Sequence, residues 1–490
     1  MIEPCDLSAT EARRLIGRKQ LSPVELTESC IARTEAVDHA VNAAVARDFE
    51  RARTAAREAE AAVMSGSPLG PLHGLPVGVT DLENVAGLRT TYGSELFRDH
   101  VPDADEGIVG SIRAGGGIVL GKTNTPEWGA GANTRNRVYG ATGNPFDPSR
   151  SAAGSSGGSA AALACGMVSL ATGSDMGGSL RNPAAFCGVV GFRPTPGVVP
   201  SERRVLGWSP LSVLGPMGRT VDDVRLMMRA IARRDLRDGL SRYCQAADAW
   251  DEPHDLATVR AAFSPDLGFA PVEHGIRATF QERVGLFRHV FAVAEEAAPE
   301  CSDADEIFAV LRAVAFLASH RDRVRDAPDR VGPNVRANVE EGLRYTAEDV
   351  ARAMVAQTAL YRRWVAFFDR YDVLVTPAIT ISPRPWSELY PREINGEPTE
   401  SYFHWLALAY AVTLAGCPAV ALPCGLDAAG MPFGLQIVGA PGADARVLAV
   451  AGALEALLAG DPRTARPVPD IACLRAAPPI SGMPGFLDLQ

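Results

Sequence analysis

Lysine is almost absent from this chain of 490 residues. Lys19 and Lys122 are its only lysines, and every other basic residue is an arginine. The formal net charge is −10, so the chain lacks the clustered positive charge that binds nucleic acids or anionic membranes. We therefore expect no nucleic-acid partner. A reaction that needs a lysine would have very few candidates here.

Paired cysteines, histidine clusters and a secretion signal are also missing. The nine cysteines are scattered, without a CxxC pair, and the first residues lack a basic stretch followed by an apolar one. This distribution predicts reduced, mostly buried thiols in a cytoplasmic protein, with no metal and no cofactor.

A membrane-spanning helix is excluded by a similar argument. The stretch from Trp405 to Leu426 carries no charge and is long enough to span a bilayer, but Gly416, Pro418 and Pro423 interrupt it. The pattern predicts a buried helix ending near Ala415 and a short buried strand at 419–422. We therefore expect no membrane partner.

The order of apolar and polar segments predicts an α/β fold. Residues 1–65 are expected to form helices, beginning with a capping box at Ser22-Pro23-Val24-Glu25 and continuing in a helix at about 49–64. Short apolar strands then alternate with helices, which favours a single large domain, 1–490, with a central mixed and largely parallel β-sheet flanked by helices on both faces. Within it we distinguish a core at 66–225, a mostly helical variable region at 226–370, and a C-terminal part of the core at 371–490. The expected strands are 76–79, 118–120, 168–171, 189–191, 372–376, 419–422 and 434–438.

Two serine- and glycine-rich segments, 154–159 and 173–179, are typical of acyl-transfer chemistry. Such a reaction needs an exposed hydroxyl, a base for its proton and N–H donors for the developing oxyanion. A Gly-Gly-Ser turn supplies the hydroxyl and the donors together, and a second serine can relay the proton. The alternative is a nucleophile elbow at Gly154-x-Ser156-x-Gly158, but no later histidine stands in a recognisable triad context.

The two segments and their flanks resemble the amidase-signature family over nearly the whole chain. The matching runs are LHGLPVGV (72–79), GKTNTPE (121–127), NPFDPSR (144–150), GSSGG (154–158), GGSLRNPAAFCG (177–188), VVGFRPT (189–195), GPMGRTVDD (215–223), VTPA (375–378), GCPA (416–419) and GLQIVG (434–439). The resemblance implies a Ser–cis-Ser–Lys triad, with Ser179 as nucleophile and Ser155 as bridging serine. It implies an oxyanion hole from backbone N–H groups at Met176, Gly177, Gly178 and Ser179, and a turn held by Asp175 and Arg181.

The chain departs from this family at the general base. The catalytic lysine should end the strand before Asp81, and Thr80 stands there instead. A threonine hydroxyl is not a base at neutral pH, and loss of a positioned general base costs roughly 10²–10⁴ in rate. A deliberate or selected substitution that traps substrate would leave the rest of the motif intact, as it is here, whereas a degenerate copy would be expected to lose Ser179 or the glycines as well. A working variant would need water or the substrate as base. Lys122 is a poor substitute, because its own motif normally coexists with the catalytic lysine.

The resemblance predicts hydrolysis of a small linear carboxylic amide, anilide or carbamate, impaired by Thr80. Trp128, Gly129, Ser156 and Trp405 are the candidate substrate-binding residues, although ordinary packing explains the aromatic ones equally well. Two alternatives stay open: a ligand-binding homologue without catalysis, and the amidase subunit of a tRNA-dependent amidotransferase. That subunit usually carries Ile-Arg-Gln-Pro after the nucleophile, where this chain has Leu180-Arg181-Asn182-Pro183. A homodimer is also left open.

Overall fold

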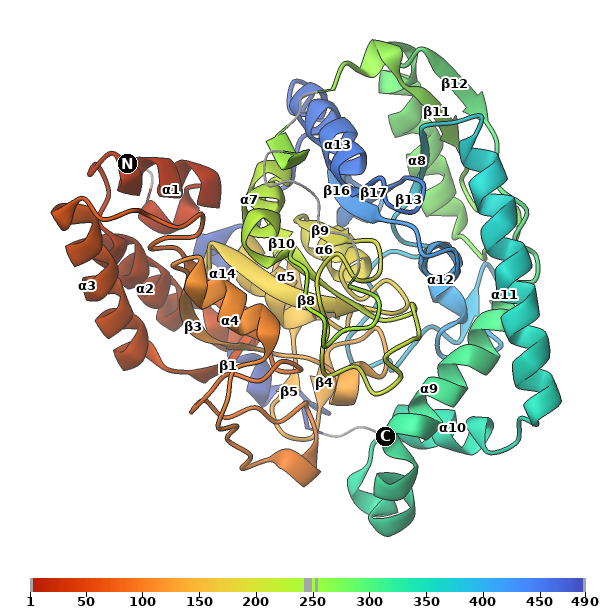
Figure 1. Ribbon diagram of the computed structural model, residues 1–490, viewed down its shortest axis with the longest axis horizontal. Coiled ribbons are helices and arrows are strands. Elements are labelled where there is room, and N and C mark those ends of the chain that lie inside the picture. Colours follow the sequence, from red (N-terminus) through yellow and green to blue (C-terminus); the bar gives the residue numbers. More distant parts are fainter. Residues whose placement is uncertain (1–2, 242–248, 252–253, 488–490) are drawn as a thin grey trace.

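The computed structural model describes residues 3–241, 249–251 and 254–487 (Figure 1). In it, side chains cap the starts of the N-terminal helices. Ser22 accepts hydrogen bonds from the N–H groups of Val24 and Glu25, and the Glu25 carboxylate accepts one from Ser22 N–H. This is the predicted capping box. The predicted helix at 49–64 is present as Phe49–Ser65 and ends at Gly66, which has a left-handed conformation. Both helix predictions are confirmed.

The elements that position the site are numbered as in Figure 1. The α-helices of the described residues are α1 (Ala9–Gly17), α2 (Pro23–Val41), α3 (Phe49–Ser65), α4 (Gly107–Ala114), α5 (Gly157–Ala164), α6 (Arg181–Cys187), α7 (Val221–Ile231), α8 (His274–Phe287), α9 (Ala304–Asp326), α10 (Pro333–Gly342), α11 (Ala347–Phe368), α12 (Ala407–Leu414), α13 (Asp444–Leu458) and α14 (Ile471–Ala476). The strands of the main sheet are β1 (Ala44–Arg47), β2 (Pro76–Thr80), β3 (Ile118–Thr123), β8 (Leu170–Asp175), β9 (Val190–Arg193), β10 (Val213–Gly218), β11 (Arg260–Phe263), β12 (Val293–Glu296), β13 (Val373–Pro377), β16 (Ala419–Leu426) and β17 (Pro432–Val438). Short two-stranded pairs are formed by β4 (Arg135–Asn136) with β5 (Gly140–Ala141), β6 (Gly143–Asn144) with β7 (Asp147–Ser151), and β14 (Glu393–Ile394) with β15 (Glu397–Pro398).

The main sheet has eleven strands in the order β1-β3-β2-β8-β10-β9-β16-β17-β13-β11-β12. It is mixed, as predicted, but the expectation that it is largely parallel is wrong. Parallel pairing is confined to β3-β2-β8 near one end and β13-β11-β12 at the other, and the pairs between them are antiparallel. Antiparallel neighbours need only a short connection. For example, the hairpin between β16 and β17 uses residues 427–431 and no crossover helix.

Helices cover both faces of the sheet, as the sequence predicts (Figure 1). The short apolar helices α5 and α6 contact each other and pack on the central strands from one face. From the other face, α7 packs on β8, β9 and β10 and contacts α4 and α13. The variable region adds α9, α10 and α11, which pack together at the side of the molecule (Figure 1). It also contributes β11 and β12, which the sequence analysis missed.

The core is continuous from the N-terminal helices to α13 and α14. The charge-free stretch at 405–426 contains α12, which ends at Leu414, and β16, which starts at Ala419, as predicted. Among the described residues, no helix has both the length and the apolar character needed to cross a membrane. Of the cysteines, Cys473 is exposed, while Cys5, Cys30, Cys165, Cys187, Cys301, Cys417 and Cys424 are buried free thiols. Cys244 lies outside the described residues.

Candidate active site

The two serine-glycine segments lie next to each other. Segment 173–179 contains the end of β8 and the turn after it, and segment 154–159 contains the start of α5 and the loop before it. The nucleophile candidate Ser179 lies in the turn from β8 to α6 and is partly exposed, whereas Ser155 is 2% exposed and follows a cis Gly154–Ser155 peptide bond. A backbone hydrogen bond from Ser156 N–H to the Ser179 carbonyl, 3.2 Å long, joins the segments directly. The structure therefore brings together the two serines that the sequence analysis selected.

Glycine is required where these segments cross. A Cβ atom at Gly173 would lie 2.4 Å from Ser156 Oγ, and Gly178 has a φ of +97°, which side chains rarely adopt. A Cβ atom at Gly178 would also lie only 2.6 Å from Ala409 Cβ. The glycine-rich composition therefore results from close packing around the turn and not from a flexible linker.

A buried ion cluster of Asp175, Arg181 and Arg193 holds the turn in place. The Asp175 carboxylate accepts hydrogen bonds from Arg181 Nε at 3.0 Å and Nη2 at 2.8 Å, and it lies 3.3 Å from Arg193 Nη1. All three side chains are fully buried. Burial alone would raise the pKa of Asp175, but the two guanidinium groups outweigh it and bring the pKa to about 2. Two arginines face one carboxylate, so the cluster has an excess of one positive charge. The sequence analysis named Asp175 and Arg181 but missed Arg193.

The backbone amides of the turn differ in what they bind. Gly178 N–H donates to Asp175 Oδ1 at 2.9 Å, so this predicted oxyanion donor is engaged within the protein. In the described part of the chain, the N–H groups of Met176, Gly177 and Ser179 have no hydrogen-bond acceptor. Of the four N–H groups named by the sequence analysis, only that of Gly178 is therefore bonded within the described chain.

Thr80 is the last residue of β2 and is fully buried. It pairs in register with Thr123, whose hydroxyl bonds to Ser159 Oγ on α5 at 2.7 Å. Register partners on parallel strands point to the same face, so the Thr80 side chain also points to the α5 face. Thr80 Oγ1 is buried without a hydrogen-bond partner, and so is Ser156 Oγ. Thr80, at the position where the sequence analysis expects a catalytic lysine, thus lies on the α5 face of the sheet and offers only a hydroxyl.

Lys122 occupies the other face of the same sheet. Its register partner is Val79, and its ammonium group donates to the backbone carbonyl of Glu83. The Glu83 carboxylate accepts a hydrogen bond from Thr172 Oγ1 at 2.6 Å, and burial together with the charge of Glu106 raises the pKa of Glu83. Burial lowers the pKa of Lys122, and the nearby carboxylates partly oppose this effect. Lys122 is therefore held by a buried polar cluster on the face of the sheet opposite to the Thr80 side chain.

A cavity of about 210 Å³ includes Met176 of the turn in its lining, and its wall combines three aromatic side chains with residues of the 204–212 segment, Arg204 among them. Met176 from the turn, Trp128, and Phe316 and His320 from α9 are among its lining residues. The Trp128 and His320 rings are 4.7 Å apart, and Trp128 has a φ of 47°, which is unusual for a bulky residue. Burial and the charge of Arg323 lower the pKa of His320 to about 3, so its ring is neutral.

The other substrate-binding candidates, Gly129, Ser156 and Trp405, differ in how close they lie to the two serines and to the cavity. A Cβ at Gly129 would be 3.4 Å from Ser155 Oγ, so the backbone there passes close to the bridging serine. Ser156 is buried, and its N–H binds the nucleophile's carbonyl. Trp405 lies in the hydrophobic core against Phe186 and is not part of the wall of the 210 Å³ cavity. The nucleophile-elbow alternative at Ser156 has no support, since no described histidine bonds to it.

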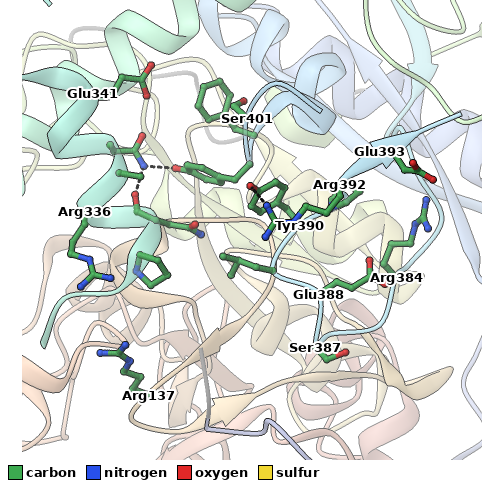
Figure 2. Close-up of a pocket in the computed structure, with 18 of the residues that line it drawn as sticks. Arg137, Arg336, Glu341, Arg384, Ser387, Glu388, Tyr390, Arg392, Glu393 and Ser401 are labelled. Atoms are coloured by element: carbon green, nitrogen blue, oxygen red, sulfur yellow. Dashed lines mark hydrogen bonds between the residues drawn. The ribbon is translucent and has the colours of Figure 1, made fainter. Parts of the chain in front are cut away.

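A larger cavity of about 1070 Å³ opens beside this region (Figure 2). Figure 2 shows Arg336 and Glu341 of α10 on one side and Tyr390 and Arg392 of the 387–393 loop facing them. Arg392 donates to the Tyr390 hydroxyl at 2.8 Å. The lining is charged and of mixed sign, which is unlike the aromatic wall next to the turn.

Several known proteins resemble this chain over most of its length. The Amidase family profile matches residues 25–448. The chain is 36% identical over 463 residues to an acylamidase of Rhodococcus erythropolis, covering 92% of this chain and 95% of that one. It is 33% identical over 478 residues to a glutamyl-tRNA(Gln) amidotransferase subunit of Symbiobacterium thermophilum, covering 92% and 96%. Among solved structures, a bacterial aryl acylamidase of the amidase-signature family superposes with a TM-score of 0.86 at 27% identity, covering 98% and 99%. This chain therefore belongs to the amidase-signature family and is an amidase, a C–N hydrolase.

Proposed function

We propose that the chain cleaves a small-molecule amide, anilide or carbamate through an acyl-enzyme on Ser179, with Ser155 as proton relay and with a rate limited by Thr80. The observation that carries this proposal is the turn at 176–179. It presents a partly exposed hydroxyl beside three uncommitted amide N–H groups, is held by buried Asp175, and is bonded to the segment containing Ser155.

The first half of the reaction forms the acyl-enzyme. Ser179 Oγ attacks the substrate carbonyl carbon, its proton moves to Ser155, and the carbonyl oxygen takes the negative charge. The N–H groups of Met176, Gly177 and Ser179 would hold that oxygen, which is the main source of transition-state stabilisation in such sites. Expulsion of the amine, which takes up a proton as it leaves, then generates the ester. A water molecule hydrolyses this ester and regenerates Ser179.

Thr80 affects the proton and not the oxyanion. The proton that reaches Ser155 needs a final acceptor, and water is a far weaker one than a neutral buried amine. The expected deficit is about 10²–10⁴ in rate. Binding and orientation of the amide do not depend on Thr80, so the chain should bind its substrate better than it turns it over.

The aromatic cavity supports an aryl substrate. Its volume of about 210 Å³ has room for one aromatic ring and some substituents, and the rings of Trp128 and Phe316 offer faces and edges to pack against it. We propose that the aryl group of an anilide or aryl amide enters here, with Gly129 leaving space beside Ser155.

The test is the activity of Thr80→Lys compared with the parent protein on a nitroanilide. We expect at least about a 10²-fold higher kcat in Thr80→Lys, and no gain in Thr80→Met, which matches the length without the amine. Ser179→Ala in the Thr80→Lys background should remove the activity. If Thr80→Lys is as inactive as the parent, the hydrolase proposal fails and the non-catalytic binding alternative gains support.

A second candidate is the amidase subunit of an amidotransferase, favoured by the 33% identity with the amidotransferase subunit of Symbiobacterium thermophilum. Such a subunit would release ammonia from glutamine and work with partner chains. Co-purification of partner chains and glutamine hydrolysis by Thr80→Lys would favour it, whereas anilide hydrolysis by the isolated chain would favour the first candidate.

We further propose that the protein acts in the cytoplasm without nucleic acid or membrane. The net charge of −10 and the buried free thiols support this proposal. A homodimer is a further prediction, which light scattering of the purified protein would test.

A further inference from the structure

A buried arginine next to the turn has no part in the chemistry described so far. Arg312 lies in α9 with a 5% exposed side chain. Among the described residues, no carboxylate lies within ion-pair distance of its guanidinium group. Burial of a charge without a counter-charge is costly, so its surroundings must stabilise it in another way.

Aromatic groups take the place of a carboxylate around Arg312. Its guanidinium carbon is 4.7 Å from the ring centre of Phe316, 5.1 Å from that of Tyr402, 5.6 Å from that of Phe403 and 5.8 Å from that of Phe308. Its Nε and Nη2 both donate to the Tyr402 hydroxyl oxygen, the former at 2.9 Å. Aromatic rings and a phenol oxygen stabilise a cation but do not cancel its charge.

The same arginine contacts the turn at Met176. Arg312 Nη1 donates to Met176 Sδ at 3.7 Å. Phe308, one of the rings around the guanidinium, packs against the turn, because a Cβ at Gly177 would lie 3.3 Å from its ring. Arg312 and Phe308 therefore support the two residues that precede Gly178 and Ser179.

The charge of Arg312 has no acid to neutralise it. The carboxylate of the turn, Asp175, is already shared by Arg181 and Arg193. Electrostatic interactions are stronger in a buried, poorly polarisable environment than in water. A negative charge that forms on the exposed side of the turn would reduce this excess of positive charge.

We propose that Arg312 is a positioning residue that holds the 176–179 turn in place and favours negative charge on the oxygen bound there. This inference rests on the proposed acyl transfer at Ser179. It predicts that Arg312 discriminates between bound states: a tetrahedral anionic adduct gains from it, and a neutral amide in the same site does not.

Phenylboronic acid and benzamide separate these two states. Ser179 Oγ adds to boron, a B–O bond forms, boron becomes tetrahedral and negatively charged, and the serine proton passes to solvent. Benzamide binds without forming a charge. Calorimetry would give the Kd of each compound for the parent, Arg312→Met and Arg312→Lys, with Arg325→Met as the matched control, because Arg325 is an exposed arginine of the same helix.

Arg312→Met should weaken phenylboronic acid about 10-fold or more while benzamide changes less than threefold. Arg312→Lys should recover most of the loss, and Arg325→Met should match the parent. Equal weakening of both compounds by Arg312→Met, or no recovery in Arg312→Lys, would overturn the inference. Tyr402→Phe is a second test if Arg312→Met does not fold: it retains the cation but removes its anchor, and should weaken phenylboronic acid more than benzamide.

Ser179→Ala distinguishes failure of this inference from failure of the proposed function. If phenylboronic acid binds Ser179→Ala as tightly as the parent, the nucleophile assignment is wrong. If binding requires Ser179 but is insensitive to Arg312, the nucleophile stands and only the role of Arg312 is refuted.

Discussion

Neutralising Asp175 should lower the free energy of unfolding strongly, because its carboxylate is fully buried between two arginines. In Asp175→Asn, the fully buried Arg181 and Arg193 would lose their common counter-charge, and the N–H groups of Gly178 and Leu180 would share one remaining acceptor oxygen. Removing one partner from a buried ion pair typically costs about 3–5 kcal/mol.

The pKa of Asp175 gives a second measure of the same interaction. Its fall from 3.8 to about 2 on folding corresponds to about 2–3 kcal/mol. Because the folded pKa is the lower one, this stability is fully present above pH 3.8 and is lost as the pH falls towards 2. The two approaches agree within their precision, so we expect a loss of about 3 kcal/mol at neutral pH.

Urea unfolding followed by tryptophan fluorescence is the assay. Asp322→Asn is the matched control, because the Asp322–Arg325 pair on α9 is exposed on both sides and should contribute less than about 1 kcal/mol. An Asp175→Asn protein that unfolds within 1 kcal/mol of the parent would refute the argument that this ion cluster holds the turn.

Three further predictions concern packing, substrate and pH. Gly173→Ala would place a Cβ 2.4 Å from Ser156 Oγ, so it should cost about 1–3 kcal/mol of stability in a thermal-melt comparison. It should also lower the rate at which a fluorophosphonate labels Ser179, and an unchanged rate would contradict the close packing. Trp128→Ala in the Thr80→Lys background should raise KM for an aryl anilide about tenfold but leave an acetamide nearly unaffected, and equal effects on both would exclude the aromatic cavity as the aryl site. Burial raises the pKa of Glu455 from 4.5 to about 7, so its contribution to stability is complete below pH 4.5 and is lost as the pH rises to 7. Glu455→Gln should therefore flatten the pH dependence of the unfolding free energy by up to about 3 kcal/mol in this range, and an unchanged slope would show that another group is responsible.

Local signals in the sequence predicted much of the fold. The capping box at Ser22 and Glu25 and the glycine and prolines between 416 and 423 act within a few residues, so their outcome can be read without tertiary structure. β11 and β12 were missed because four-residue strands in a helix-rich region have no distinctive periodicity. The antiparallel centre of the sheet also escaped prediction, because pairing depends on which strands become neighbours.

Parts of the site depend on contacts between distant segments. Phe316, His320 and Arg312 belong to α9 and reach the turn from more than a hundred residues away in sequence. In the sequence these residues are ordinary members of a charged helix, and only packing against the turn distinguishes them. The opposite faces of Thr80 and Lys122 likewise become certain only from strand register.

The sequence by itself determined the chemistry that this protein can attempt. The sequence specifies which functional groups are present: the Ser179 hydroxyl, the glycines around it, and a threonine at position 80. The tertiary structure alone decided how those groups are used: which amides of the turn remain unbonded, that Lys122 lies across the sheet, and that buried arginines surround the turn. The physical reason is that charge and hydrogen bonding depend on distance and burial, and both arise only when segments far apart in the chain pack together.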